Sequence, residues 1–106
     1  MNTWYVVYTQ PGAEMLAQGE LEKQGFEVYC PRYSRNVRHA RSVKRAILAL
    51  FPRYLFVRID LTSQRWRPIN GTRGVSYIIT MNERPCTVPD GVVERIKERE
   101  NAEQLI

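Results

Sequence analysis

The chain has 106 residues, of which 43% are hydrophobic and 25% charged, and its formal net charge is +5. These values are ordinary for a globular protein of one domain, which can bury a core without disulfide or metal staples. The sequence also excludes a membrane-spanning helix, because no segment approaches the run of about 18 apolar residues that a bilayer requires. The N-terminus also lacks the features of a signal peptide.

The first third of the chain predicts a strand, a helix and a second strand. Residues 4–8 form a continuous apolar run, which is typical of a buried central strand. Apolar residues at helical spacing predict a helix over residues 13–24 with a glycine cap at Gly25, followed by a strand over residues 26–30. In the helix, the residues expected to face inward are Ala13, Leu16, Ala17 and Leu21, and those expected to face solvent are Glu14, Gln18, Glu22 and Lys23.

The positive charge is concentrated in the next quarter of the chain. Eight basic residues lie between Arg32 and Arg58 with no acidic residue among them: Arg32, Arg35, Arg38, Arg41, Lys44, Arg45, Arg53 and Arg58. Residues 31–49 are too polar for a core, so we expect a protruding β-hairpin with its tip near residues 39–42, or a mobile loop. The segment either contacts an anionic partner or is only solvated.

Two alternating sets of side chains run through this basic segment, and neither set is apolar. The first is Arg35, Val37, His39, Arg41, Val43 and Arg45, and the second is Asn36, Arg38, Ala40, Ser42 and Lys44.

Residues 50–59 predict a strand from Arg53 onward, because they are rich in aromatic and β-branched types. Pro52 would stand at its start, where a missing N–H costs least. One face of this strand would be aliphatic and suited to a core, with Leu55, Val57 and Ile59, and the other would carry Tyr54, Phe56 and Arg58. Either helices cover both faces of the sheet, or the aromatic face binds a partner.

The remaining residues predict a short helix, a strand and a last helix. Thr62 or Ser63 would cap the short helix, Pro68 would limit it to about a turn, and Trp66 and Ile69 would dock on the core. A strand over 75–80, a loop over 81–85 and a helix starting at Pro89 would follow, with Val92, Val93 and Ile96 facing inward. The order predicts an α+β fold: a mostly antiparallel four-stranded sheet flanked by helices, with a protruding basic hairpin.

No catalytic or metal-binding motif is present. The sequence has no GxGxxG, P-loop, HExxH or CxxC pattern. We interpret His39, the only histidine, as a solvated side chain. Cys30 and Cys86 lie far apart, and we interpret them as reduced thiols of a cytoplasmic protein. The sequence therefore predicts a protein that is not an enzyme and that holds no metal or other cofactor.

Three motifs at matching spacing point to a known family: Trp4-Tyr5-Val6-Val7-Tyr8, Leu50-Phe51-Pro52-Arg53-Tyr54-Leu55-Phe56-Val57 and Thr72-Arg73-Gly74-Val75. With Trp66 and Asn82-Glu83-Arg84-Pro85, they resemble the N-terminal domain of NusG, and more narrowly its specialised RfaH-like paralogues. The resemblance covers nearly the whole chain. It implies an NGN-type domain over residues 1–100.

The family implies a transcription elongation and antitermination factor that regulates transcription by favouring processive elongation. Its partners would be the largest and second-largest subunits of RNA polymerase, and it would act as a monomer with no membrane contact. An apolar depression would bind the clamp helices of the largest subunit through Tyr8, Phe51, Pro52, Tyr54 and Phe56. The contact with the gate region of the second-largest subunit would involve Arg65, Trp66 and Arg67.

DNA of the elongation complex is a further expected partner, contacted mainly at its backbone. We expect this contact at Arg38, Arg41, Lys44, Arg45 and Arg73. RfaH-like paralogues read a DNA element with polar and basic residues where this chain has Gln10, Pro11, Glu14 and Glu20, so recognition of the same element is not expected. The family also carries a C-terminal KOW domain, so residues 101–106 would begin the linker to that domain, which is absent from this chain.

Two alternatives belong to other functional classes. Residues 53–59 superficially resemble the aromatic strand of an RRM, on which single-stranded nucleic acid stacks, although the glycines of that signature are missing. A small interaction domain unconnected with transcription is the other. Direct binding of short RNA would support the RRM-like alternative, and co-purification with RNA polymerase would support the NusG-like one.

Overall fold

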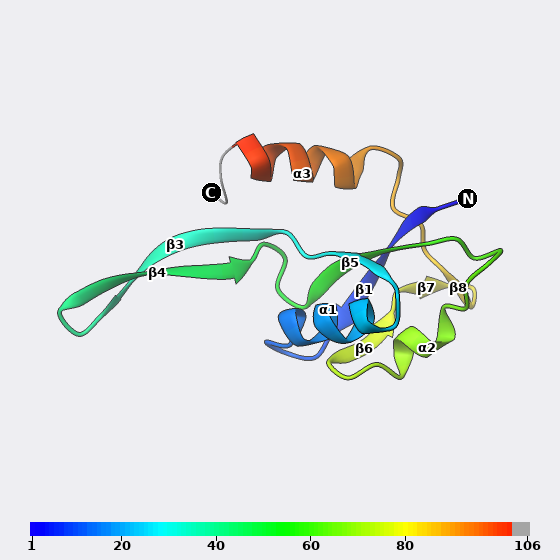
Figure 1. Ribbon diagram of the computed structural model, residues 1–106, viewed down its shortest axis with the longest axis horizontal. Coiled ribbons are helices and arrows are strands. Elements are labelled where there is room, and N and C mark those ends of the chain that lie inside the picture. The colour runs from blue at the N-terminus through cyan, green and yellow to red at the C-terminus, as the bar shows by residue number, and fades with distance from the viewer. Residues whose placement is uncertain (103–106) are drawn as a thin grey trace.

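An antiparallel sheet of four strands in the order β2-β5-β1-β6 lies at the centre of the computed structural model, which describes residues 1–102 (Figure 1). Its strands are β1 (Thr3–Thr9), β2 (Glu27–Tyr29), β5 (Tyr54–Ile59) and β6 (Val75–Ile78). The predicted α+β class and antiparallel sheet are confirmed. The apolar run at the start of the chain forms the central strand β1, which pairs with β5 and β6.

Helices lie over both faces of this sheet (Figure 1). Helices α1 (Glu14–Lys23) and α2 (Arg67–Asn70) pack on the aliphatic face, where they close the larger core. Helix α3 (Val92–Ala102) lies over the opposite face and closes a smaller core of Trp4, Phe56, Val88 and Val93. The aromatic face is therefore covered at one end only, so the expectation that helices cover both faces holds in part, and the binding of a partner at the uncovered end stays a prediction.

The basic segment forms a hairpin of β3 (Arg32–His39) and β4 (Ser42–Ala49), which projects along the longest dimension of the molecule, 53 Å (Figure 1). Asn36 lies opposite Arg45, and Arg38 lies opposite Val43. Residues that face each other thus come from different predicted sets, so the assignment of the β4 residues to the two sets is wrong. A two-residue turn places odd-numbered residues opposite even-numbered ones, which interchanges the faces of the second strand.

A second, smaller hairpin stands where the sequence predicts a loop over residues 81–85. It consists of β7 (Thr80–Met81) and β8 (Arg84–Pro85). Asn82 and Glu83 make its two-residue turn, with φ angles of 53° and 64°. Two consecutive positive φ angles are what a tight hairpin turn of this kind requires, and asparagine tolerates them well.

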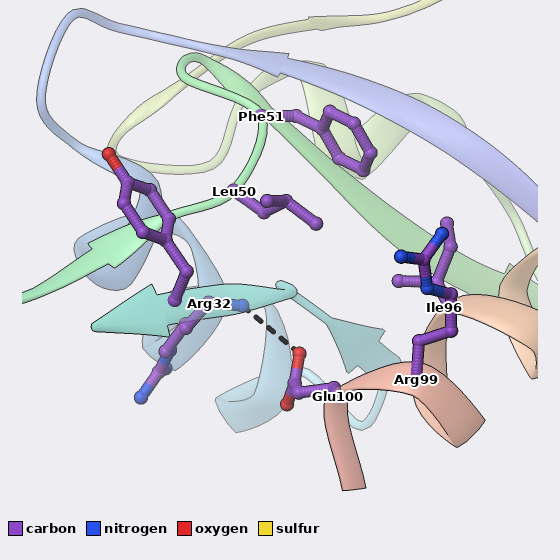
Figure 2. A pocket seen from close by; sticks show the side chains of 7 residues that line it. Arg32, Leu50, Phe51, Ile96, Arg99 and Glu100 are labelled. Carbon is purple, nitrogen blue, oxygen red and sulfur yellow. Dashed lines mark hydrogen bonds between the residues drawn. The ribbon is translucent and has the colours of Figure 1, made fainter. Parts of the chain in front are cut away.

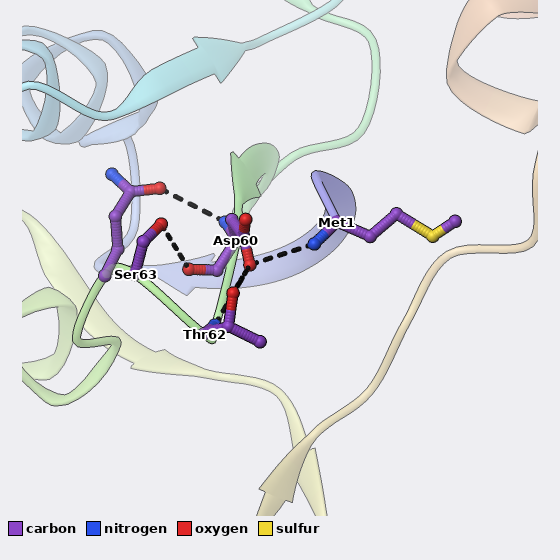
Figure 3. Close-up of polar contacts among 5 residues, drawn as sticks. Met1, Asp60, Thr62 and Ser63 are labelled. Carbon is purple, nitrogen blue, oxygen red and sulfur yellow. Dashed lines mark hydrogen bonds and ion pairs between the residues drawn. The ribbon is translucent and has the colours of Figure 1, made fainter.

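Asp60 organises the turn after β5 and ties it to the N-terminus (Figure 3). Its Oδ1 accepts hydrogen bonds from the Thr62 hydroxyl at 2.6 Å and the Thr62 backbone N–H at 3.0 Å, and lies 3.0 Å from the Met1 ammonium. The hydrogen bond from the Thr62 hydroxyl, followed by that from the Met1 ammonium, lowers the pKa of Asp60 to about 2. The N-cap of α2 is Trp66, with no side-chain capping bond, so the prediction that Thr62 or Ser63 caps this helix is wrong.

Three further boundaries or orientations differ from the predictions. Helix α3 starts at Val92 rather than Pro89, and it extends to Ala102, so the predicted boundary at residue 100 falls within the helix. The rest of the predicted linker, residues 103–106, lies outside the described residues. In α1, Leu16 is exposed and Glu14 is buried, the reverse of the expectation. Within residues 1–102, no helix has the length and apolarity needed to cross a membrane.

Candidate functional site

An apolar pocket of about 290 Å³ lies where the base of the basic hairpin, the connection from β4 to β5 and helix α3 meet (Figure 2). Leu50 and Phe51 line one side of the pocket, and Ile96 of α3 lines the other. The side chains of Leu50 and Phe51 are nevertheless 42% and 39% exposed. Exposed apolar side chains around a concave surface are typical of a site that binds another macromolecule. The full lining is Arg32, Tyr33, Leu50, Phe51, Ile96, Arg99 and Glu100.

Glu100 fixes the wall of the pocket that α3 contributes. Its Oε2 accepts a hydrogen bond from the Tyr29 hydroxyl at 2.8 Å and from the backbone N–H of Arg32 at 3.1 Å. Burial raises the pKa of Tyr29 well above its ordinary value, and the hydrogen bond to the Glu100 carboxylate raises it further. Tyr29 therefore stays a neutral hydrogen-bond donor, and α3 is joined to both β2 and the start of β3.

A row of three tyrosines continues from this region across the sheet. Tyr8 stands opposite both Tyr54 on β5 and Tyr77 on β6. The ring centroids are 5.1 Å apart for Tyr8 and Tyr54, and 5.3 Å apart for Tyr8 and Tyr77. The two outer rings are exposed. This row is the part of the aromatic face that α3 leaves uncovered.

Arg53 holds the turn that presents Phe51 and Pro52. Its φ is +72°, which is unusual for a residue other than glycine. Its backbone N–H donates to Glu14 Oε2 at 2.8 Å, its Nε donates to the Thr9 carbonyl at 3.1 Å, and its guanidinium carbon lies 4.0 Å from the centroid of the Tyr8 ring. These contacts stabilise a strained backbone, and they explain why Glu14 faces inward.

Four of the five residues predicted for the clamp-helix surface share one accessible region, and the fifth does not. Phe51 lines the pocket, Pro52 lies in the adjoining turn rather than at the start of β5, and Tyr8 and Tyr54 form the row. Phe56 is only 8% exposed, because the residues of α3 cover it. The prediction that Phe56 is an exposed anchor is therefore wrong. Its ring supports Phe51 edge-on, with centroids 6.3 Å apart.

The predicted gate-side residues lie together around the start of α2. Arg65 and Arg67 are exposed, whereas Trp66 is half-buried and packs against the larger core. The guanidinium carbon of Arg67 lies 4.8 Å from the centroid of the Trp66 ring. All three line a shallow hollow of about 650 Å³.

The basic residues predicted to contact nucleic acid fall into two places. Arg38, Arg41, Lys44 and Arg45 are exposed on the outer part of the hairpin, where Arg45 also donates to the Ser34 hydroxyl at 2.8 Å. Arg73 is exposed between α2 and β6 and is not part of the hairpin. Sequence reasoning missed Val43 and Ile47, which are 57% and 55% exposed on the hairpin.

Nothing in the described residues forms a metal centre, since no group of three or more histidine, cysteine, aspartate or glutamate side chains could hold an ion there. Both cysteines are free. Cys30 is buried, and burial raises the pKa of its thiol. The row consists of aromatic side chains and the pocket lining includes Leu50, Phe51 and Ile96, so both can bind a partner through apolar and aromatic groups.

Sequence reasoning missed three residues of the candidate surface. The patterns place Leu50 just before the strand predicted from Arg53, Ile96 on an inward helix face, and Tyr77 within a predicted strand whose neighbours in the sheet are unknown. Leu50 and Tyr77 are exposed, whereas Ile96 packs against the smaller core as predicted and also lines the pocket. That these residues gather at one surface depends on how α3 and β6 meet the rest of the sheet, and a one-dimensional pattern does not contain that information.

Comparison with known proteins gives concordant results. A family model described as transcription termination factor nusG matches residues 2–97. The transcription termination/antitermination protein NusG of Thermus thermophilus is 29% identical over 111 residues, which cover 90% of this chain and 60% of the relative. A structure titled "Domain interaction in Thermotoga maritima NusG" matches the fold with a TM-score of 0.63 at 21% identity, over 85% of this chain and 52% of that one. The chain thus spans about 60% or less of the relatives it matches, and it belongs to the NusG family.

Proposed function

We propose that this domain is a transcription elongation factor that binds the clamp helices of RNA polymerase through the pocket and the adjoining tyrosines. The observation that carries the proposal is the exposed apolar surface of Leu50, Phe51 and Tyr54, beside the half-buried Tyr8, in a chain of the NusG family. An amphipathic helix binds by inserting apolar side chains into such a groove. Binding at this surface would favour processive elongation without covalent chemistry, and the narrower resemblance to RfaH-like paralogues stays a prediction.

The other two surfaces extend the proposal to the second-largest subunit and to DNA. Arg65, Trp66 and Arg67 offer a charged hollow for the gate region. The hairpin offers basic side chains to the phosphates of the DNA. The RRM-like alternative loses its basis, because the family match covers the strand that suggested it, and the central Tyr8 ring is occupied by Arg53 rather than open to a base.

Truncation of Tyr54 tests the clamp-helix proposal. We expect Tyr54→Ala to weaken binding to RNA polymerase about thirtyfold, because aromatic anchors commonly contribute ~2 kcal/mol to an interface. The matched control is Met15→Ala, since both side chains are 41% exposed and Met15 lies on α1 at the other face of the sheet. Affinity is measured with purified polymerase, and pausing is measured in an elongation assay. Equal affinity of the two variants, with folding confirmed, contradicts the proposal.

Removal of charge tests the proposed contact between the hairpin and DNA. We expect replacement of Arg38, Arg41, Lys44 and Arg45 by alanine to weaken binding to the elongation complex at low salt. The dependence of log affinity on log salt should also become less steep, by about 0.9 for each phosphate that the hairpin no longer neutralises. Lysine at the three arginine positions keeps the charge and should keep the slope. An alanine variant whose affinity matches the parent at both low and high salt would show that the hairpin is only solvated.

A further inference from the structure

Tyr77 is the third ring of the aromatic row, and it belongs neither to the lining of the apolar pocket nor to the basic hairpin. It is 48% exposed, more than Tyr54 at 41%. Its ring packs against Tyr8 at an interplanar angle of 42°, nearly the 45° between Tyr8 and Tyr54, so the outer rings flank Tyr8 in a similar way. A large aromatic side chain that is half exposed at the edge of a sheet contributes little to the core, and it is the kind of group that anchors an interface.

The width of the row fits a helical partner. Neighbouring strands lie about 4.8 Å apart, so rings on three strands span ~10 Å, which is the diameter of an α-helix with its side chains. Arg53 covers the central ring at 4.0 Å. The exposed rings of Tyr54 and Tyr77 therefore stand at the two borders of the row, where both can contact one helix placed over it.

Tyr77 also connects the two surfaces that are proposed to face polymerase. Besides belonging to the row, it lines a hollow of about 400 Å³ at the β6 edge of the sheet, together with Trp66 and Arg67. This hollow thus joins the β6 end of the row to two residues of the gate-side contact.

We propose that Tyr77 contacts the same clamp helices as Tyr54, so that the site for the largest subunit extends across β1 to the edge strand β6. This inference rests on the proposed function. Its partner is a polymerase helix rather than nucleic acid, because the tilted rings and the guanidinium on Tyr8 leave no flat platform for successive bases.

The first test measures affinity for purified RNA polymerase. We expect Tyr77→Ala to weaken binding about tenfold and Tyr77→Phe to leave it within about twofold, because the ring makes the contact. Met15→Ala again serves as the control for loss of an exposed side chain, and circular dichroism confirms folding. If Tyr54→Ala weakens binding and folded Tyr77→Ala does not, the inference is wrong and the proposed function stands. If neither variant weakens binding, both fail.

A second readout keeps an aromatic ring in place. The photoreactive residue p-benzoyl-L-phenylalanine, introduced instead of Tyr77, is expected to crosslink to the largest subunit of polymerase, and the same residue at position 15 is not. Crosslinking from position 77 to the second-largest subunit alone, or to nucleic acid alone, would overturn the assignment to the clamp helices.

Discussion

Replacement of Phe56 by alanine is expected to lower the free energy of unfolding by about 4 kcal/mol, the usual size for a buried phenylalanine. The side chain is 8% exposed and shares the smaller core with Trp4, Val88 and Val93. It also stacks on Tyr29 and supports Phe51, each with ring centroids 6.3 Å away. The variant leaves a cavity under α3, and this cavity is too large for the few residues around it to fill.

Urea denaturation followed by circular dichroism measures this effect, and Tyr54→Ala on the same strand is the control. Tyr54 points to the same face but is exposed, so its truncation should change the free energy of unfolding by less than about 1 kcal/mol. The pair separates a residue that supports the surface from one that forms it. Similar stability of the two variants would mean that α3 does not cover Phe56 in solution.

The strands were predictable because their signals are local. The apolar run of residues 4–8 and the alternation of residues 54–59 each indicate a strand without reference to the rest of the chain, and the two strands are neighbours in the sheet. The hairpin was predictable for the opposite reason, since a long polar segment between two apolar strands has no place in the core. The tip was correctly predicted near residues 39–42, whereas the face on which each side chain of β4 lies depended on the length of the turn, which the pattern did not give.

The composition of the candidate site was less predictable, because it depends on contacts between distant segments. The spacing of residues in α3 indicates which of them face inward, but it could not show that they pack on Phe56 rather than on the aliphatic face. Glu14 occupies a position that looks solvent-facing in α1, and only the strained Arg53 backbone, 39 residues further along the chain, explains its burial. A carboxylate that satisfies a backbone N–H leaves no periodic signal.

Gly74 gives a physical reason for the motif Thr72-Arg73-Gly74-Val75. This segment lies against α1: the Gln24 side chain donates to the Thr72 hydroxyl at 2.7 Å, and the Gly74 carbonyl accepts from the Gln10 backbone at 2.8 Å. The φ of Gly74 is +89°, and a Cβ placed there would lie 3.0 Å from the backbone nitrogen of Ala17 and 3.2 Å from its Cα. The two nearest atoms that a methyl group would meet belong to the helix backbone, so they cannot move aside as a flexible side chain would.

We therefore expect Gly74→Ala to lower the free energy of unfolding by about 3 kcal/mol, from left-handed strain of ~1 kcal/mol and crowding of ~2 kcal/mol. Gly91→Ala separates these contributions, because Gly91 has the same φ of +89° and a methyl group added to it would meet nothing within 4 Å. That control should lose only about 1 kcal/mol, the strain alone. Urea denaturation of both variants measures the difference. Equal losses would show that α1 yields to the added methyl group, and that the close approach at Gly74 is not what the motif requires.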